Sequence, residues 1–270
     1  MPALPLSAYL VFLEVAVGGA IALFLVHLRG EVGRGFTLFT GYCLLATAAL
    51  ALWLRTSFPP PLTVFLRTEA GLWFTAERTL TIAFIVLLAS YLVALQARRM
   101  AAAGLLGPIV PLAGLGALWS AALVDPGPQL VGLGAPFAIL AGAVALGSAV
   151  TGLSLGHWYL VTPGLSTRPL IRLVFLSLGA MVAQLLLLPL LLLLPGAAHA
   201  PALLGEYGLF FAVRVVFGLV VSPAVAIMAW RTARIRSLDS ATGLLYIMAA
   251  LVLTGEIVAR TLFFLSGVAT

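Results

Sequence analysis

The sequence is poor in charged residues. Only 8% of its 270 residues are charged, whereas soluble globular domains carry about a quarter. Hydrophobic residues make up 63% of the chain, which excludes an ordinary soluble domain and is typical of a helical membrane protein. We therefore expect the lipid bilayer to be the immediate partner of this chain.

Lysine is absent, so all 14 basic residues are arginine and the formal net charge is +6. The arginines are spread over several short connections rather than gathered into one patch. This distribution argues against nucleic acid as a partner.

Cysteine is nearly absent. The single Cys43 excludes a disulfide framework and any iron–sulfur cluster held by this chain alone. The Walker, Rossmann, HExxH and nucleophile-elbow patterns are also missing, so we expect no bound metal and no hydrolytic enzyme.

Apolar stretches of about 20 residues, the length that crosses a bilayer, recur along the chain. They predict an all-α fold, a polytopic membrane bundle of about eight transmembrane helices in a single domain, residues 1–270. The N-terminus has no basic region before its apolar run, so we expect a first span there rather than a cleaved signal peptide. The expected spans are 6–28, 35–54, 76–96, 101–123, 134–160, 169–194, 206–230 and 241–266.

Two segments break this pattern. Residues 55–75 contain a run of prolines and are then mildly amphipathic, so we expect them to lie along the membrane interface. Residues 101–123 are interrupted by glycine and proline, which predicts a kinked helix.

Arginine is distributed unequally between the two sets of connections. The connections after the first, third, fifth and seventh spans hold nine, and the other set holds three, offset by Glu69 and Glu77. The positive-inside rule then places both termini outside (N-out/C-out) in a multi-pass protein of the cell inner (cytoplasmic) membrane. The nine are Arg29, Arg34, Arg98, Arg99, Arg168, Arg172, Arg231, Arg234 and Arg236, and the three are Arg55, Arg67 and Arg78.

Four charges fall inside the expected spans at one depth. Glu256 and Arg260 lie four residues apart on the last span, so they share a helical face and can pair. Glu14 on the first span and Arg214 on the seventh reach a similar depth, roughly 9–15 Å into the outer leaflet. Ionisable residues within a membrane usually face the protein interior, so we expect either one enclosed cluster or two unrelated pairs that hold helices together.

A polar pocket in an apolar bundle suits a lipophilic molecule with polar head atoms, such as a quinone or quinol. Glu14, whose neighbours in FLEVAV are wholly apolar, is the best candidate for the proton acceptor. Arg214 or Arg260 could hold a quinone oxygen, and Glu256 completes the expected binding site. The spacing alone does not distinguish a quinol from another amphipathic ligand.

Two stretches resemble a known family. AYLVFLEVAVGGAIALFL in the first span resembles the opening helix of NrfD-like and polysulfide-reductase-type quinol-interacting membrane subunits, which carries a comparable aromatic and Gly-Gly pattern. GEIVARTLFF, residues 255–264, resembles the closing helix of the DMSO-reductase-type membrane anchors, and eight spans with both termini outside match that family. GHWYLVTPGL at 156–165 departs from the family's pattern.

The resemblance implies a membrane subunit of a respiratory redox complex that is not catalytic alone. It would hold no cofactor of its own and would pass electrons between the quinone pool and an iron–sulfur partner subunit. The iron–sulfur and catalytic subunits are expected on the outer face. The alternatives are a small-solute transporter or channel, and a ligand-free membrane scaffold or assembly subunit.

The histidines could have a different use. His27 and His157 end the first and fifth spans at a similar inner depth, where two facing histidines could ligate a b-type haem. Each is single on its helix, and His199 lies in an outer loop, so we expect interfacial or hydrogen-bonding histidines rather than haem. Gln184, midway along the sixth span, is expected to join helices rather than to contact a ligand.

Overall fold

The computed structural model describes residues 3–59, 68–124, 132–162, 164–193 and 200–270. Across these residues it is all-helical, and eight spans are long and apolar enough to cross a membrane, which confirms the predicted bundle. The helices are α1 (Ala3–His27), α2 (Arg34–Ser57), α4 (Thr68–Gln96), α5 (Met100–Leu123), α6 (Gly134–Val161), α7 (Arg168–Leu193), α8 (Ala200–Leu204), α9 (Gly208–Val213), η2 (Arg214–Val221), α10 (Ser222–Arg234) and α11 (Leu238–Ser266).

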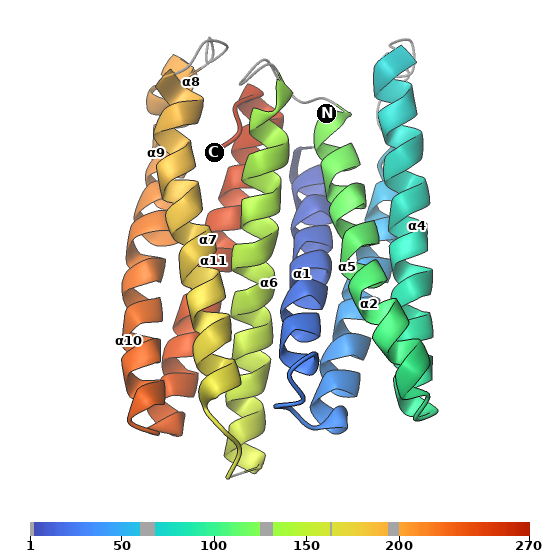
Figure 1. Cartoon of the computed structure of the whole chain (residues 1–270). Helices are drawn as coiled ribbons and strands as arrows, with labels where there is room; N and C mark the ends of the chain where they lie inside the picture. The colour runs from blue at the N-terminus through green and yellow to red at the C-terminus, as the bar shows by residue number, and fades with distance from the viewer. Residues whose placement is uncertain (1–2, 60–67, 125–131, 163, 194–199) are drawn as a thin grey trace.

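Both termini lie at the same end of the bundle, because the long helices run alternately up and down (Figure 1). We call this the terminal end and the opposite one the arginine-rich end. Short turns at the arginine-rich end join α4 to α5 and α10 to α11, and each contains an arginine with positive φ, Arg98 at 58° and Arg236 at 60°. The predicted N-out/C-out orientation would place the terminal end outside.

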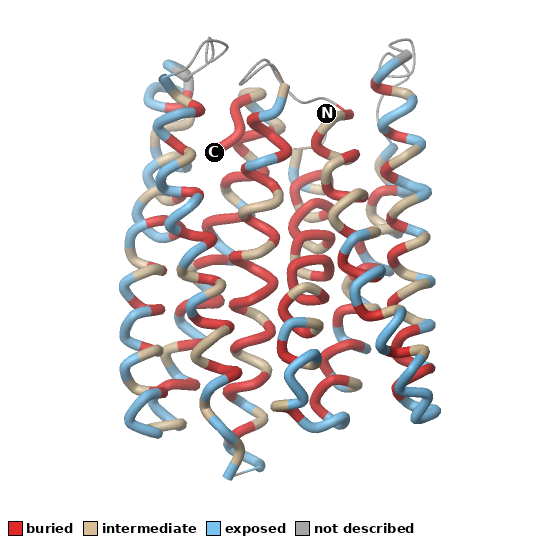
Figure 2. The backbone as a smooth tube through the Cα atoms, viewed as in Figure 1, coloured by how far each residue is buried: buried red, intermediate tan, exposed pale blue. Residues whose placement is uncertain are grey.

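Helices α1, α6 and α11 form the centre of the bundle. Helix α1 packs against α2, α5, α6 and α11, and Figure 2 shows α1 and α6 buried along most of their length. The closest approach joins Gly18 to Gly147, where a Cβ on either glycine would overlap the backbone of the other helix. Small residues allow this kind of close helix contact in membranes.

The seventh span is built from three segments. An α-helical start (α9) is followed by eight residues of π-helix (η2) and then by α10, which contains proline in its first turn. That residue, Pro223, has no N–H, so the usual α-helical donor to the carbonyl of Leu219 is missing. A wider turn just before this proline is consistent with that loss, and π-type turns often occur at functional sites.

The expectation for residues 55–75 is wrong at both ends. Helix α2 continues to Ser57, and α4 already begins at Thr68 as part of the third span; residues 60–67 lie outside the described part. Arg67 and His199 also lie outside it. The proline-containing stretch 101–123 is a single helix, α5, with Pro108 and Pro111 inside it.

Candidate functional site

The structure brings the four predicted intramembrane charges together, and Arg260 of α11 lies between the two acids. Its Nε is 2.8 Å from Oε1 of Glu14 on α1. Its Nη2 donates to Oε2 of Glu256 at 2.8 Å, as the four-residue spacing predicted, and to the carbonyl of Ala138 on α6 at 3.2 Å. Arg260 therefore ties three central helices together.

Arg214, the first residue of η2, extends the network toward α7. Its Nη1 donates to Oε1 of Glu256 at 3.0 Å, and its Nη2 donates to Oε1 of Gln184. The same Nη2 reaches the backbone carbonyl of Thr270 at 3.3 Å. We call Glu14, Arg260, Glu256, Arg214 and Gln184 the central network. The expected role of Gln184 in joining helices agrees with this position.

Glycines make room for the central network. A Cβ on Gly142 of α6 would lie 2.5 Å from both Arg260 Nη2 and Glu256 Oε2, so only glycine leaves space for these groups. A Cβ on Gly218 of η2 would lie 2.9 Å from the Cα of Gly255 on α11. The close approach at Gly218 and Gly255 brings η2 near enough for Arg214 to reach Glu256.

The central network is shut off from the surroundings. Glu14 and Arg260 are 0% exposed, and Glu256 and Arg214 are 1% exposed. If all four groups are ionised, two positive charges balance two negative ones. Burying ions at this depth costs desolvation free energy unless their polar atoms are satisfied. The pairing of acids with arginines offsets that cost.

Some polar atoms of the network are nevertheless unsatisfied among the described residues. Oε2 of Glu14 has no hydrogen-bond partner, and Oε1 makes the 2.8 Å ion pair with Arg260 Nε. Nη1 of Arg260 and Nε2 of Gln184 are also without partners. Buried unsatisfied groups are rare in proteins and commonly indicate a water, a ligand or a proton-handling role.

The tail after α11 covers the network on the terminal side. Gly267 ends the helix with φ of 70°, a left-handed conformation that favours glycine. The chain then turns inward, so that Val268, Ala269 and Thr270 are all buried. Figure 1 shows the C-terminus near the terminal end of the bundle, between α6 and α7 in this view. This segment, Gly267 to Thr270, is called the tail below.

A second buried network was missed at the sequence level. Arg55 of α2 binds Glu77 of α4 through two bonds, Nε to Oε1 at 2.7 Å and Nη2 to Oε2 at 2.8 Å. Tyr9 of α1 donates its hydroxyl to the same carboxylate, and the Arg55 guanidinium lies over the rings of Tyr9 and Phe74. Counting Arg55 and Glu77 as loop charges was therefore wrong.

The two predicted haem candidates have different surroundings. The His27 ring packs edge-on against Tyr91 of α4, with centroids 5.9 Å apart, and His157 is exposed. Trp158, next to His157, packs on Phe36 of α2. None of these contacts joins the two histidines, and the expected absence of haem stays a prediction.

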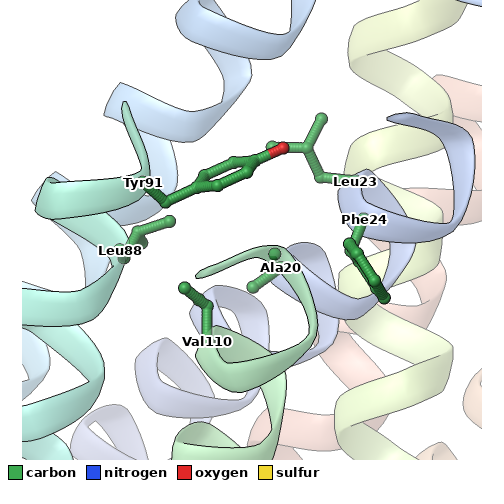
Figure 3. A pocket seen from close by; sticks show the side chains of 7 residues that line it. Ala20, Leu23, Phe24, Leu88, Tyr91 and Val110 are labelled. Carbon is green, nitrogen blue, oxygen red and sulfur yellow. The ribbon is translucent and has the colours of Figure 1, made fainter. Parts of the chain in front are cut away.

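A small cavity lies beside Tyr91, between α1, α4 and α5 (Figure 3). It measures about 10 Å³, which is room for about one water molecule. The Tyr91 hydroxyl is buried and has no hydrogen-bond partner among the described residues. The cavity is too small for an organic ligand, and its lining side chains are apolar apart from the Tyr91 hydroxyl.

Comparison with known proteins gives no match to a family model, a curated protein or a solved structure. Function is therefore argued from the site itself. Among the described residues no group of three or more histidine, cysteine, aspartate or glutamate side chains could hold a metal ion.

Proposed function

We propose that this protein is the quinone-exchanging membrane subunit of a respiratory redox complex, with Glu14 as its proton acceptor. One observation carries the proposal. The Glu14 carboxylate is fully buried, its Oε1 lies 2.8 Å from Nε of Arg260, and its Oε2 has no hydrogen-bond partner among the described residues.

The unsatisfied atoms match the polar head of a quinone or quinol. A quinol hydroxyl can donate to a carboxylate oxygen of Glu14, and a quinone oxygen can accept from Nη1 of Arg260, which also lacks a partner among the described residues. One quinone or quinol that contacts both side chains would make the hydrogen bonds that the described residues leave unmade. The surrounding helices offer an apolar environment for the rest of such a molecule.

The residues of the network divide into two roles under this proposal. Oxidation of a quinol releases two protons and two electrons. Glu14 takes up the first proton at its Oε2 and releases it to water at the terminal end, and it then takes up and releases the second proton in the same way. Glu256 is bound by Arg214 and Arg260, one at each oxygen, so it keeps its negative charge and positions both guanidinium groups. The electrons pass to the iron–sulfur partner subunit that the family resemblance implies.

Access to the closed network requires movement of a covering element. The tail is the described segment that lies over Arg214 on the terminal side, through the 3.3 Å bond from Arg214 to Thr270. In the predicted orientation this side faces outward, where the iron–sulfur subunit is expected.

A ligand-free scaffold is the alternative that has an observation in its favour. Glu256 is bound at both oxygens by fully buried arginines, as in a network that only locks helices together. The ion pair of Glu14 with Arg260 would serve such a lock as well, so the two functions are separated by whether a quinone binds at Glu14.

The test is ligand-dependent stability of the purified protein. Decylubiquinone or a short-chain menaquinone analogue should raise the unfolding temperature, while decanol, which has the tail but no quinone head, should not. Glu14→Gln should abolish the quinone-dependent rise, and Glu69→Gln, an exposed acid in the first turn of α4, should keep it. Equal rises in both variants, or none in the native protein, would overturn the proposal and favour the scaffold.

A further inference from the structure

A groove opens on the outside of the bundle between α4 and α5, away from the central network. Its volume is about 690 Å³, and its walls are apolar or small side chains that include Val86, Val93, Ala97 and Ala102. One cation, Arg99, lies among the lining residues at the turn that joins the two helices.

The groove has the depth of one membrane leaflet. Its lining on α4 runs from Ile85 to Ala94, nine residues along the helix, which corresponds to about 14 Å. Half of the hydrocarbon core of a bilayer is about 15 Å thick. The groove therefore extends from the arginine-rich end to about the middle of the membrane.

The mouth of the groove is strongly basic. Arg98 and Arg99 are both exposed in the α4–α5 turn, and Arg34 of α2 donates to the carbonyl of Gln96 at 3.2 Å just before that turn. The residues that line the groove include no acid. Clustered arginines next to a membrane helix attract anionic lipid head groups.

We propose that this groove binds an anionic phospholipid of the leaflet at the arginine-rich end. One acyl chain lies between α4 and α5, along Val86, Ser90 and Val93, and the head-group phosphate binds at Arg99. Val86 and Val93 are 57% and 62% exposed, so the described residues leave their side chains open to contact with an acyl chain. Arg99 supplies the charge complementarity that selects an anionic head group over a zwitterionic one.

Lipid binding by the purified protein tests the proposal. Native mass spectrometry with added dioleoyl-phosphatidylglycerol or dioleoyl-phosphatidylcholine should show tighter binding of the anionic lipid. Arg99→Gln should reduce that preference about fivefold, the effect of one arginine near an anionic head group. Arg168→Gln, which removes an exposed arginine from the start of α7 at the same end, should leave the preference unchanged.

A second variant tests the groove itself. Ala97→Phe fills the space beside Arg99 and should weaken the binding of both lipids while the unfolding temperature of the lipid-free protein stays the same. Equal binding of the two lipids by the native protein, or equal effects of Arg99→Gln and Arg168→Gln, would overturn the proposal. A native dimer that Ala97→Phe converts to a monomer would show that the groove holds a second copy of the chain instead.

Discussion

Arg214 and Arg260, two fully buried arginines on different helical segments, bind opposite oxygens of one carboxylate. The distances are 3.0 Å from Arg214 Nη1 to Glu256 Oε1 and 2.8 Å from Arg260 Nη2 to Glu256 Oε2. Glu256 thus separates two like charges that would otherwise repel each other inside the bundle. Glu14 supplies the second negative charge, from the other side of Arg260.

Glu256→Gln should be the most damaging single change in the central network. It leaves Arg214 without a carboxylate and Arg260 with Glu14 alone. Breaking a buried ion pair in this way costs about 3–5 kcal/mol. The folded yield and the unfolding temperature in detergent should fall well below those of Glu14→Gln, which leaves both arginines bound to Glu256. The opposite order of the two variants would contradict this arrangement of charges.

Glu14→Gln should remove turnover while lowering the stability less than Glu256→Gln does. The amide keeps the shape of the side chain but cannot take up a proton. Quinol-linked turnover of the native complex should fall by about 10²–10⁴-fold, the usual effect of losing a positioned acid or base. Yield and turnover are measured on one preparation. Unchanged turnover in a variant that assembles normally would remove Glu14 from the mechanism.

Gly147→Ala should disrupt the contact between α1 and α6. The added methyl group overlaps backbone atoms of Gly18 and Gly19, which cannot rotate away as a side chain could. The variant should lose more stability than the range typical of an overpacked core, about 1–3 kcal/mol. Gly179→Ala on α7 is the matched control, because nothing lies within 4 Å of its Cβ position, and it should stabilise by about 0.5–1 kcal/mol. Thermal unfolding of the two variants in one detergent provides the comparison.

Glu77→Gln should destabilise the second network without affecting quinone binding. Arg55 is 7% exposed and would lose its carboxylate, so we expect a cost of about 3–5 kcal/mol. Tyr9→Phe removes a single hydrogen bond to the same carboxylate and should cost less, about 1.5–3 kcal/mol. The exposed Glu69→Gln should stay within about 0.5 kcal/mol of the native protein. Similar losses in all three variants would show that Arg55 and Glu77 are not paired.

Both termini should face the outside of the cell membrane. A periplasmic reporter fused after Thr270 should be active, and a cysteine in place of Ser237, in the α10–α11 turn, should react with thiol reagents only from the cytoplasmic side. The reason is the excess of arginine in the turns at the opposite end. A fusion that is active only in the cytoplasm would reverse the orientation and move the central network to the inner half of the membrane.

Hydropathy was sufficient to predict the spans, because length and apolar composition largely determine which segments cross a bilayer. The central network was also predictable in part. Charged side chains at equal depth in a membrane bundle can avoid lipid by pairing with one another. The structure shows ion pairs among Glu14, Arg214, Glu256 and Arg260. Their functional roles remain predictions.

The features that were missed depend on distances that no sequence pattern reveals. Arg55 and Glu77 were counted as loop charges because they lie at the edges of the predicted spans 35–54 and 76–96, whereas α2 and α4 extend past both positions. The π-helical segment and the bond from Arg214 to Thr270 depend on how η2 and the tail pack on α11. Such packing arises only once the helices are assembled.

The two glycine contacts limit how this bundle can move. At Gly18 and Gly147, and at Gly218 and Gly255, one helix lies directly on the backbone of the next, so neither pair can come closer. Each contact is a pivot: the helices can rock about it, but sliding along it would drive neighbouring side chains into the opposing backbone. These contacts leave a tilt of η2 and α10 about α11 as the helix movement that could accompany displacement of the tail, with α1 and α6 as the fixed frame.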